Sequence, residues 1–107
     1  MKDENTICKV LPQPKDLIVF LTVIRKLSFA AAAEELGQSP AYISKRIGVL
    51  ETNLATRLFH RSTRKIVLTD DGERTQRWAM RILTDIDDMV DDLTEAQHIP
   101  RGFLHIC

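Results

Sequence analysis

Apolar residues recur at helical spacing over most of the chain. Two segments, residues 16–26 and 39–54, each carry an apolar stripe, formed by Leu17, Phe20, Leu21 and Ile24 in the first and by Ile43, Ile47, Leu50 and Leu54 in the second. Residues three, four and seven positions apart share one face of an α-helix, so each segment predicts a helix that packs on a core. The pattern predicts a mainly α fold.

Helix start and stop signals divide the middle of the chain into two short helices. Ser28 is a good N-cap, because its hydroxyl can accept a hydrogen bond from an unpaired backbone N–H, and the alanine-rich run after it favours helix until Gly37. Ser39 and Pro40 repeat the start signal, with a hydroxyl cap and a proline at the first helical position. These signals predict a helix-turn-helix over about residues 29–48.

The periodicity changes after this helix pair. Two short β-prone runs, 58–61 and 65–68, flank a polar turn, so residues 58–68 are expected to form a small basic β-hairpin. Thr69 then restarts a helix, with acidic residues in the first turn, where the helix dipole favours negative charge.

The last predicted helix is long, because nothing interrupts it before Pro100. Its apolar residues alternate in steps of three and four, the spacing of a coiled coil. We call these six residues the apolar seam: Ala79, Ile82, Ile86, Met89, Leu93 and Ala96. Residues 73–99 are therefore expected to form a dimerisation helix. Trp78, near its start, is expected to pack against the preceding domain.

Charge is unevenly distributed, although the net charge is zero. Residues 15–68 carry nine Lys and Arg against four Asp and Glu, whereas residues 69–99 carry three against nine. Such asymmetry indicates a half that binds a polyanion and a second half with another task. The sequence therefore favours nucleic acid as a partner.

Length and composition exclude several classes of protein. The 107 residues suit one domain rather than a large multidomain enzyme, and no apolar stretch approaches the roughly 20 residues of a membrane-spanning helix. The first residues lack the pattern of a secretory signal, so a cytoplasmic location is expected. Cys8 and Cys107 are far apart and have no metal-ligand spacing. No metal, cofactor or catalytic residue is expected.

A DNA-binding helix-turn-helix inserts its second helix into the major groove. Residues 39–53 would be this recognition helix, and the hairpin 58–68 would be a wing on the backbone or in the minor groove. Polar, small and cationic side chains supply the candidate DNA contacts: Ser28, Ser39, Pro40, Ala41, Tyr42, Ser44, Lys45 and Arg46 on the helix pair, and Arg61, Arg64 and Lys65 on the wing.

Five linked motifs support the same interpretation. Residues 28–37, 39–47, 50–51, 58–61 and 68–72 resemble, in order, the N-terminal region of LysR-type transcriptional regulators. The resemblance implies a winged helix-turn-helix over residues 15–72 after an N-terminal tail at 1–14, followed by a linker helix that dimerises in antiparallel fashion.

The resemblance also implies partners. A homodimer of this type binds a pseudo-palindromic operator in double-stranded DNA, and a small-molecule effector binds a separate C-terminal domain. Residues 100–107 look like the first strand of that domain, and the rest of the domain is expected to be missing from this sequence. Within the family, residues 39–46 and 54–61 look most like regulators of hydroxy-dicarboxylate use, such as malate or tartrate catabolism.

Four positions depart from the family pattern, the first being Ala30, which stands where a threonine is common. Leu27 stands where a glycine is frequent, and Pro40 stands where a glutamine is frequent, which removes one candidate base reader. Ala55 replaces the usual glycine ahead of the wing and is expected to extend the helix before it.

Two other functions compete with DNA binding. Asp87, Asp88 and Asp91 match the D-D-x-x-D pattern with which some enzymes hold Mg²⁺ against a diphosphate, but a solvated acidic helix face explains them as well. A protein-only coiled-coil dimerisation module would explain residues 73–97 and leave the basic hairpin without a role. Salt-sensitive DNA binding would distinguish these alternatives.

Overall fold

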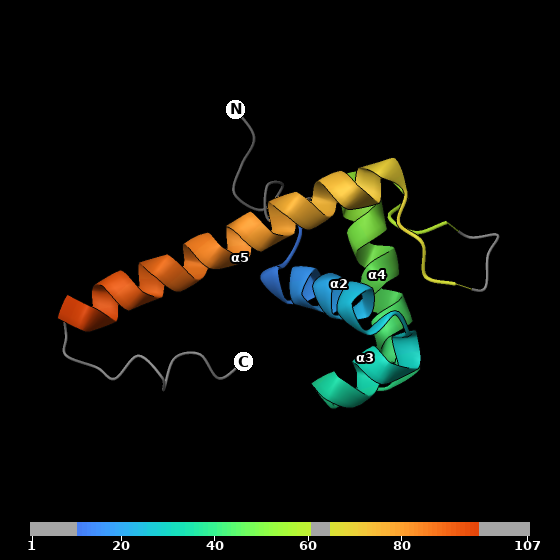
Figure 1. Cartoon of the computed structure of the whole chain (residues 1–107), viewed down its shortest axis with the longest axis horizontal. Coiled ribbons are helices and arrows are strands. Elements are labelled where there is room, and N and C mark those ends of the chain that lie inside the picture. Colours follow the sequence, from blue (N-terminus) through green and yellow to red (C-terminus); the bar gives the residue numbers. More distant parts are fainter. Residues whose placement is uncertain (1–10, 61–64, 97–107) are drawn as a thin grey trace.

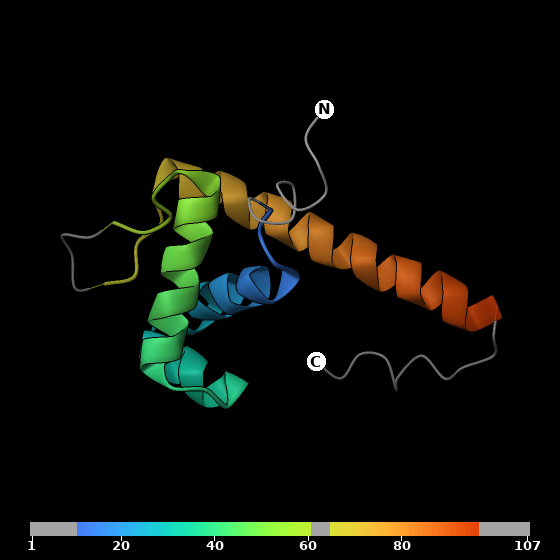
Figure 2. The ribbon, with the colours of Figure 1, turned by 180° about the vertical axis from the view of Figure 1, so that it is seen from behind.

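The computed structural model of this chain describes residues 11–60 and 65–96, which form four helices (Figure 1). They are α2 (Pro14–Lys26), α3 (Phe29–Leu36), α4 (Pro40–Leu54) and α5 (Asp70–Ala96). The first three pack together as a head. From both sides, α5 is seen to cross the head and to extend beyond it (Figure 2). The mainly helical class is confirmed. The expected tail before residue 11 and the expected strand after residue 99 lie outside the described residues.

The predicted hydroxyl caps are present at three helix starts. The Oγ of Ser28 accepts a hydrogen bond from the backbone N–H of Ala31, and the Oγ of Ser39 accepts one from Tyr42, each at 3.1 Å. Thr69 caps α5 in the same way, because its Oγ1 accepts from the N–H of Gly72 at 2.9 Å. These bonds pair backbone donors that a helix start leaves free.

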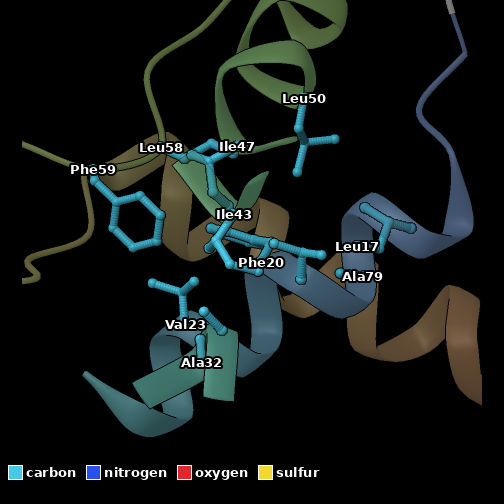
Figure 3. Packing of buried hydrophobic residues seen from close by; sticks show 12 residues of the cluster. Leu17, Phe20, Val23, Ala32, Ile43, Ile47, Leu50, Leu58, Phe59 and Ala79 are labelled. Carbon is cyan, nitrogen blue, oxygen red and sulfur yellow. The ribbon is translucent and has the colours of Figure 1, made fainter. Parts of the chain in front are cut away.

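The core lies where α2, α3 and α4 meet (Figure 3). Phe20 from α2 and Ile43 from α4 are fully buried, and Ala32 supplies the small contact from α3. Phe59, which follows α4, packs its ring edge-on against Phe20 with the ring centroids 5.5 Å apart. The core therefore fixes α4 against α2 and also holds the start of the 58–68 segment.

The first turns of α5 belong to the same core. Ala79 is 1% exposed and packs in the cluster that contains Leu17, and Leu83 packs against that cluster. Ala79 was expected to face a second chain, but its own head already covers it. Trp78 was expected to pack against the head, yet it is 60% exposed. Successive helical residues point about 100° apart, so the burial of Ala79 turns Trp78 outward.

Two helices end on non-glycine residues in the left-handed conformation. Leu27 has φ 57° after α2, and Ala55 has φ 54° after α4. The expectation that Ala55 extends the helix is therefore wrong, because α4 ends at Leu54 and Ala55 closes it. The family glycines that Leu27 and Ala55 replace are explained by this conformation, which glycine adopts without a steric cost.

We expect Leu27→Gly and Ala55→Gly each to raise the free energy of unfolding by roughly 0.5–1 kcal/mol, because each removes a side chain strained at positive φ. Glu34→Gly, at an exposed and ordinary helical position of α3, is the matched control and should lower the same quantity by about as much. Denaturant unfolding of the three variants measures the effect. Equal losses at all three positions would contradict the prediction.

Candidate nucleic-acid interface

The helix pair predicted from the sequence is formed by α3 and α4. Residues 37–39 join the two helices, and Gly37 makes the turn with φ 67°. Its N–H ends α3 by donating a hydrogen bond to the backbone carbonyl of Glu34 at 3.3 Å. The turn positions the start of α4 on one side of the head, which gives that helix an exposed N-terminal half.

The N-terminal half of α4 brings most of the predicted contact residues together. Exposed side chains there are Ser39, Pro40, Ala41, Ser44 and Lys45, while Tyr42 is half-buried. Ser28 lies apart from them at the start of α3, half-buried, with its hydroxyl used in the cap. The face thus offers small residues, hydroxyl groups, an aromatic edge and a cation, the mixture that suits close approach to a nucleic acid.

Arg46 differs from the other predicted contacts on α4. Its guanidinium faces α2 and binds the carboxylate of Asp16, with Nε 2.6 Å from Oδ1 and an Nη 2.8 Å from Oδ2. The Arg46 side chain is 18% exposed, and that of Asp16 is fully buried. Arg46 was predicted as a DNA contact, but the buried carboxylate of Asp16 draws its guanidinium toward α2.

The 58–68 segment is described only at its base. Phe59 and Leu68 form one antiparallel β-bridge, and the N–H of His60 donates to Val67 at 2.9 Å. No longer strand is present in residues 11–60 and 65–96, so a complete hairpin wing is not seen in this part of the chain. Lys65 is exposed. The predicted contacts Arg61 and Arg64 lie outside the described residues.

A network of hydrogen bonds joins the end of α4, the base of this segment and the start of α5. The carboxylate of Glu51 accepts from the buried N–H of Leu58 at 2.9 Å. Thr69 donates from Oγ1 to the carbonyl of Arg57 at 2.6 Å, and its N–H donates to Leu58 at 3.0 Å. The sequence motif contained Glu51 and Thr69, but nothing in its periodicity indicated that they anchor this segment.

Some positive charge of the head is compensated locally. The guanidinium of Arg25 binds the carboxylate of Glu35, and Nζ of Lys26 lies 3.4 Å from it. The hydrogen bond from Arg25 holds the pKa of the Glu35 carboxyl below its usual range. On α4 itself, Lys45 keeps its cation on the exposed face.

The far half of α5 presents apolar and acidic surface. Ile82, Ile86, Met89 and Leu93 of the apolar seam are between 37% and 55% exposed. Nothing is described of the Ala96 side chain. Across residues 11–60 and 65–96, no group of three or more His, Cys, Asp and Glu side chains could hold a metal ion, so the D-D-x-x-D run gains no support as a magnesium site. None of the described helices could cross a membrane.

A head with this helix pair and a long following helix defines a helix-turn-helix protein. Residues 14–73 match the family model described as "Bacterial regulatory helix-turn-helix protein, lysR family". The match covers more than half of the chain, and the chain belongs to this family.

Two curated relatives from Escherichia coli K12 are transcriptional regulators by name. The chain is 50% identical over 96 residues to the HTH-type transcriptional regulator DmlR and 44% identical over 95 residues to the HTH-type transcriptional activator TtdR. The alignments cover 90% and 89% of this chain but 31% of each relative. The chain thus spans about a third of their length.

Solved structures share the fold. The BenM DNA-binding domain in complex with catB site 1 DNA is similar with a TM-score of 0.76 at 26% identity, over 82% of this chain and 98% of that one. OxyR of Corynebacterium glutamicum is similar with a TM-score of 0.71 at 30% identity, over 81% of this chain and 27% of that one.

Proposed function

We propose that this chain binds double-stranded DNA in a sequence-specific manner, as the DNA-binding part of a cytoplasmic LysR-type transcriptional regulator. In this proposal α4 enters the major groove, and the 58–68 segment acts as a wing on the backbone or in the minor groove. Its contacts are Ser39, Pro40, Ala41, Tyr42, Ser44 and Lys45 around the start of α4, together with Ser28, Arg61, Arg64 and Lys65.

The observation that carries this proposal is the exposed N-terminal half of α4. Ser39 caps the start of this helix, and Ala41, Ser44 and Lys45 are exposed after it. The opposite face of the helix is held in the core by the buried Ile43 and Ile47. A rigid helix with small residues and a cation on its outer face can lie deep in a major groove. The similar BenM domain was solved as a DNA complex, which supports DNA as the partner.

We further propose that the chain dimerises through the far half of α5. Four members of the apolar seam are exposed, and such a stripe on a helix that leaves the head favours pairing with a second copy. We propose an antiparallel arrangement of the two α5 helices, which is what the resemblance to LysR-type regulators implies.

We also propose how such a regulator is controlled. Its small-molecule effector would bind a C-terminal domain. The sequence of residues 39–46 and 54–61, which resembles regulators of hydroxy-dicarboxylate use, supports control of a pathway such as malate or tartrate catabolism.

DNA binding is tested by selecting duplexes from a random pool with this chain and measuring affinity against salt. We expect the affinity to fall with a log–log slope of roughly −0.9 per phosphate contact, because each contact releases counterions. Lys45→Met should make the slope shallower by about 0.9. Arg77→Met, which removes the same charge from an exposed site on α5, should leave it unchanged. Binding without salt dependence, or none, would contradict the proposed function.

A further inference from the structure

The ion pair between Asp16 and Arg46 is the most completely buried charge of the head. Asp16 lies in the first turn of α2 and is 0% exposed, and its partner comes from α4, 30 residues later. The hydrogen bond to Asp16 raises the pKa of Arg46 above its usual range. Arg46 therefore keeps its proton and its positive charge beside Asp16.

The geometry of this pair constrains orientation more than it adds stability. Two nearly parallel N–H···O bonds, of 2.6 and 2.8 Å, fix both the distance and the angle between Asp16 and Arg46. The apolar contacts of Ile43 and Ile47 with α2 and the core have no such direction. The desolvation free energy of two buried charges is about as large as the free energy of their attraction. Apolar residues of similar size therefore often replace such a pair without loss of stability.

The position of the pair on α4 links it to the proposed DNA contacts. Arg46 follows directly after the exposed Ser44 and Lys45, and Tyr42 lies close enough to contribute to the raised pKa of Arg46. A rotation of α4 would therefore move these contacts together. The carboxylate also compensates the charge of Arg46, so the pair adds little to the attraction of phosphate.

We propose that Asp16 and Arg46 are positioning residues for DNA recognition: Asp16 holds Arg46, and the pair sets the orientation in which α4 meets the base edges. Arg46 does not act as an independent phosphate contact. This proposal rests on the proposed DNA-binding function and assigns a role to Asp16, which lies outside the exposed face.

The test uses Asp16→Leu combined with Arg46→Met, which replaces the ion pair by apolar side chains and leaves no buried charge alone. Lys45→Met is the matched control on the same helix. Each protein is titrated with one duplex that the unmodified chain selects from a random pool and with a scrambled duplex, over a series of salt concentrations. Circular dichroism of each variant establishes that it is folded. Asp16→Asn is the second variant, should the double variant fail to fold.

We expect the double variant to lose roughly tenfold or more of its preference for the selected over the scrambled duplex, because misplaced base contacts carry that preference. Its salt slope should stay within about 0.3 of the original value, whereas that of Lys45→Met should fall by about 0.9. Asp16→Asn should lose preference in the same way.

Two results would overturn the proposal. A slope that falls by about 0.9 in the double variant would show that Arg46 is a phosphate contact. An unchanged preference in a folded variant would show that the pair has only a structural role. Failure of the proposed function itself is distinguishable, because the unmodified chain would then select no duplex.

Discussion

Ile86→Asp combined with Leu93→Asp should convert the protein into monomers and weaken its binding to a selected operator by at least about 100-fold. Both side chains belong to the apolar seam, and they are 37% and 54% exposed. Neither packs against the core of its own head. The substitutions therefore place charges in the proposed dimer interface and leave each head folded, so a loss of affinity would come from the lost connection between two heads.

The size of this effect follows from bivalency. When one head of a dimer is bound, the other finds its half-site as an intramolecular step, which increases the overall affinity by a factor of about 100 to 10,000. Aspartate is especially unfavourable here, because the second half of α5 is already acidic.

Thr84→Asp is the matched control for the dimer variant. Thr84 is exposed on α5 and lies two residues from both Ile82 and Ile86, about 200° around the helix from each, so its charge points away from the seam. Sedimentation velocity measures the oligomeric state, and DNA titration measures the affinity. An unchanged dimer in the double variant, or an equal loss of affinity in Thr84→Asp, would contradict the proposed interface.

The helices of the head could be predicted from the sequence because their signals are local. The caps at Ser28 and Ser39 act on backbone groups within three residues, and the apolar periodicity of α2 and α4 identifies the faces that pack in the core. The exposed face of α4 follows from the same periodicity, since it is the face opposite Ile43 and Ile47. Local chemistry thus accounts for most of the candidate interface.

The features that the sequence did not reveal depend on contacts between distant residues. Asp16 resembles an ordinary acidic residue in a first helical turn, and only the fold brings Arg46 to it. Ala79 fits the apolar seam perfectly in spacing, yet the crossing of α5 over α2 buries it in the head. Periodicity identifies an apolar face, but it does not tell which neighbour covers that face.

The junction between the 58–68 segment and α5 depends on one glycine. A Cβ built on Gly72 would lie 2.2 Å from the carbonyl oxygen of Leu58 and 2.9 Å from Cδ2 of Leu68. The first of these atoms belongs to the backbone and accepts the hydrogen bond from the N–H of Thr69. A side chain at position 72 therefore cannot be accommodated by a rotamer change alone, and the backbone at the base of the proposed wing has to move.

We expect Gly72→Ala to lower the free energy of unfolding by about 2–3 kcal/mol, because the overlap separates the start of α5 from Leu58 and strains the bonds that Thr69 makes there. Gly48→Ala is the matched control: it lies inside α4 with no atom within 4 Å of the added Cβ, so alanine should raise the same free energy by roughly 0.5–1 kcal/mol through its higher helix propensity. Urea unfolding of both variants compares the signs directly. A Gly72→Ala protein as stable as the original would mean that the close approach of Gly72 to Leu58 does not hold this junction together.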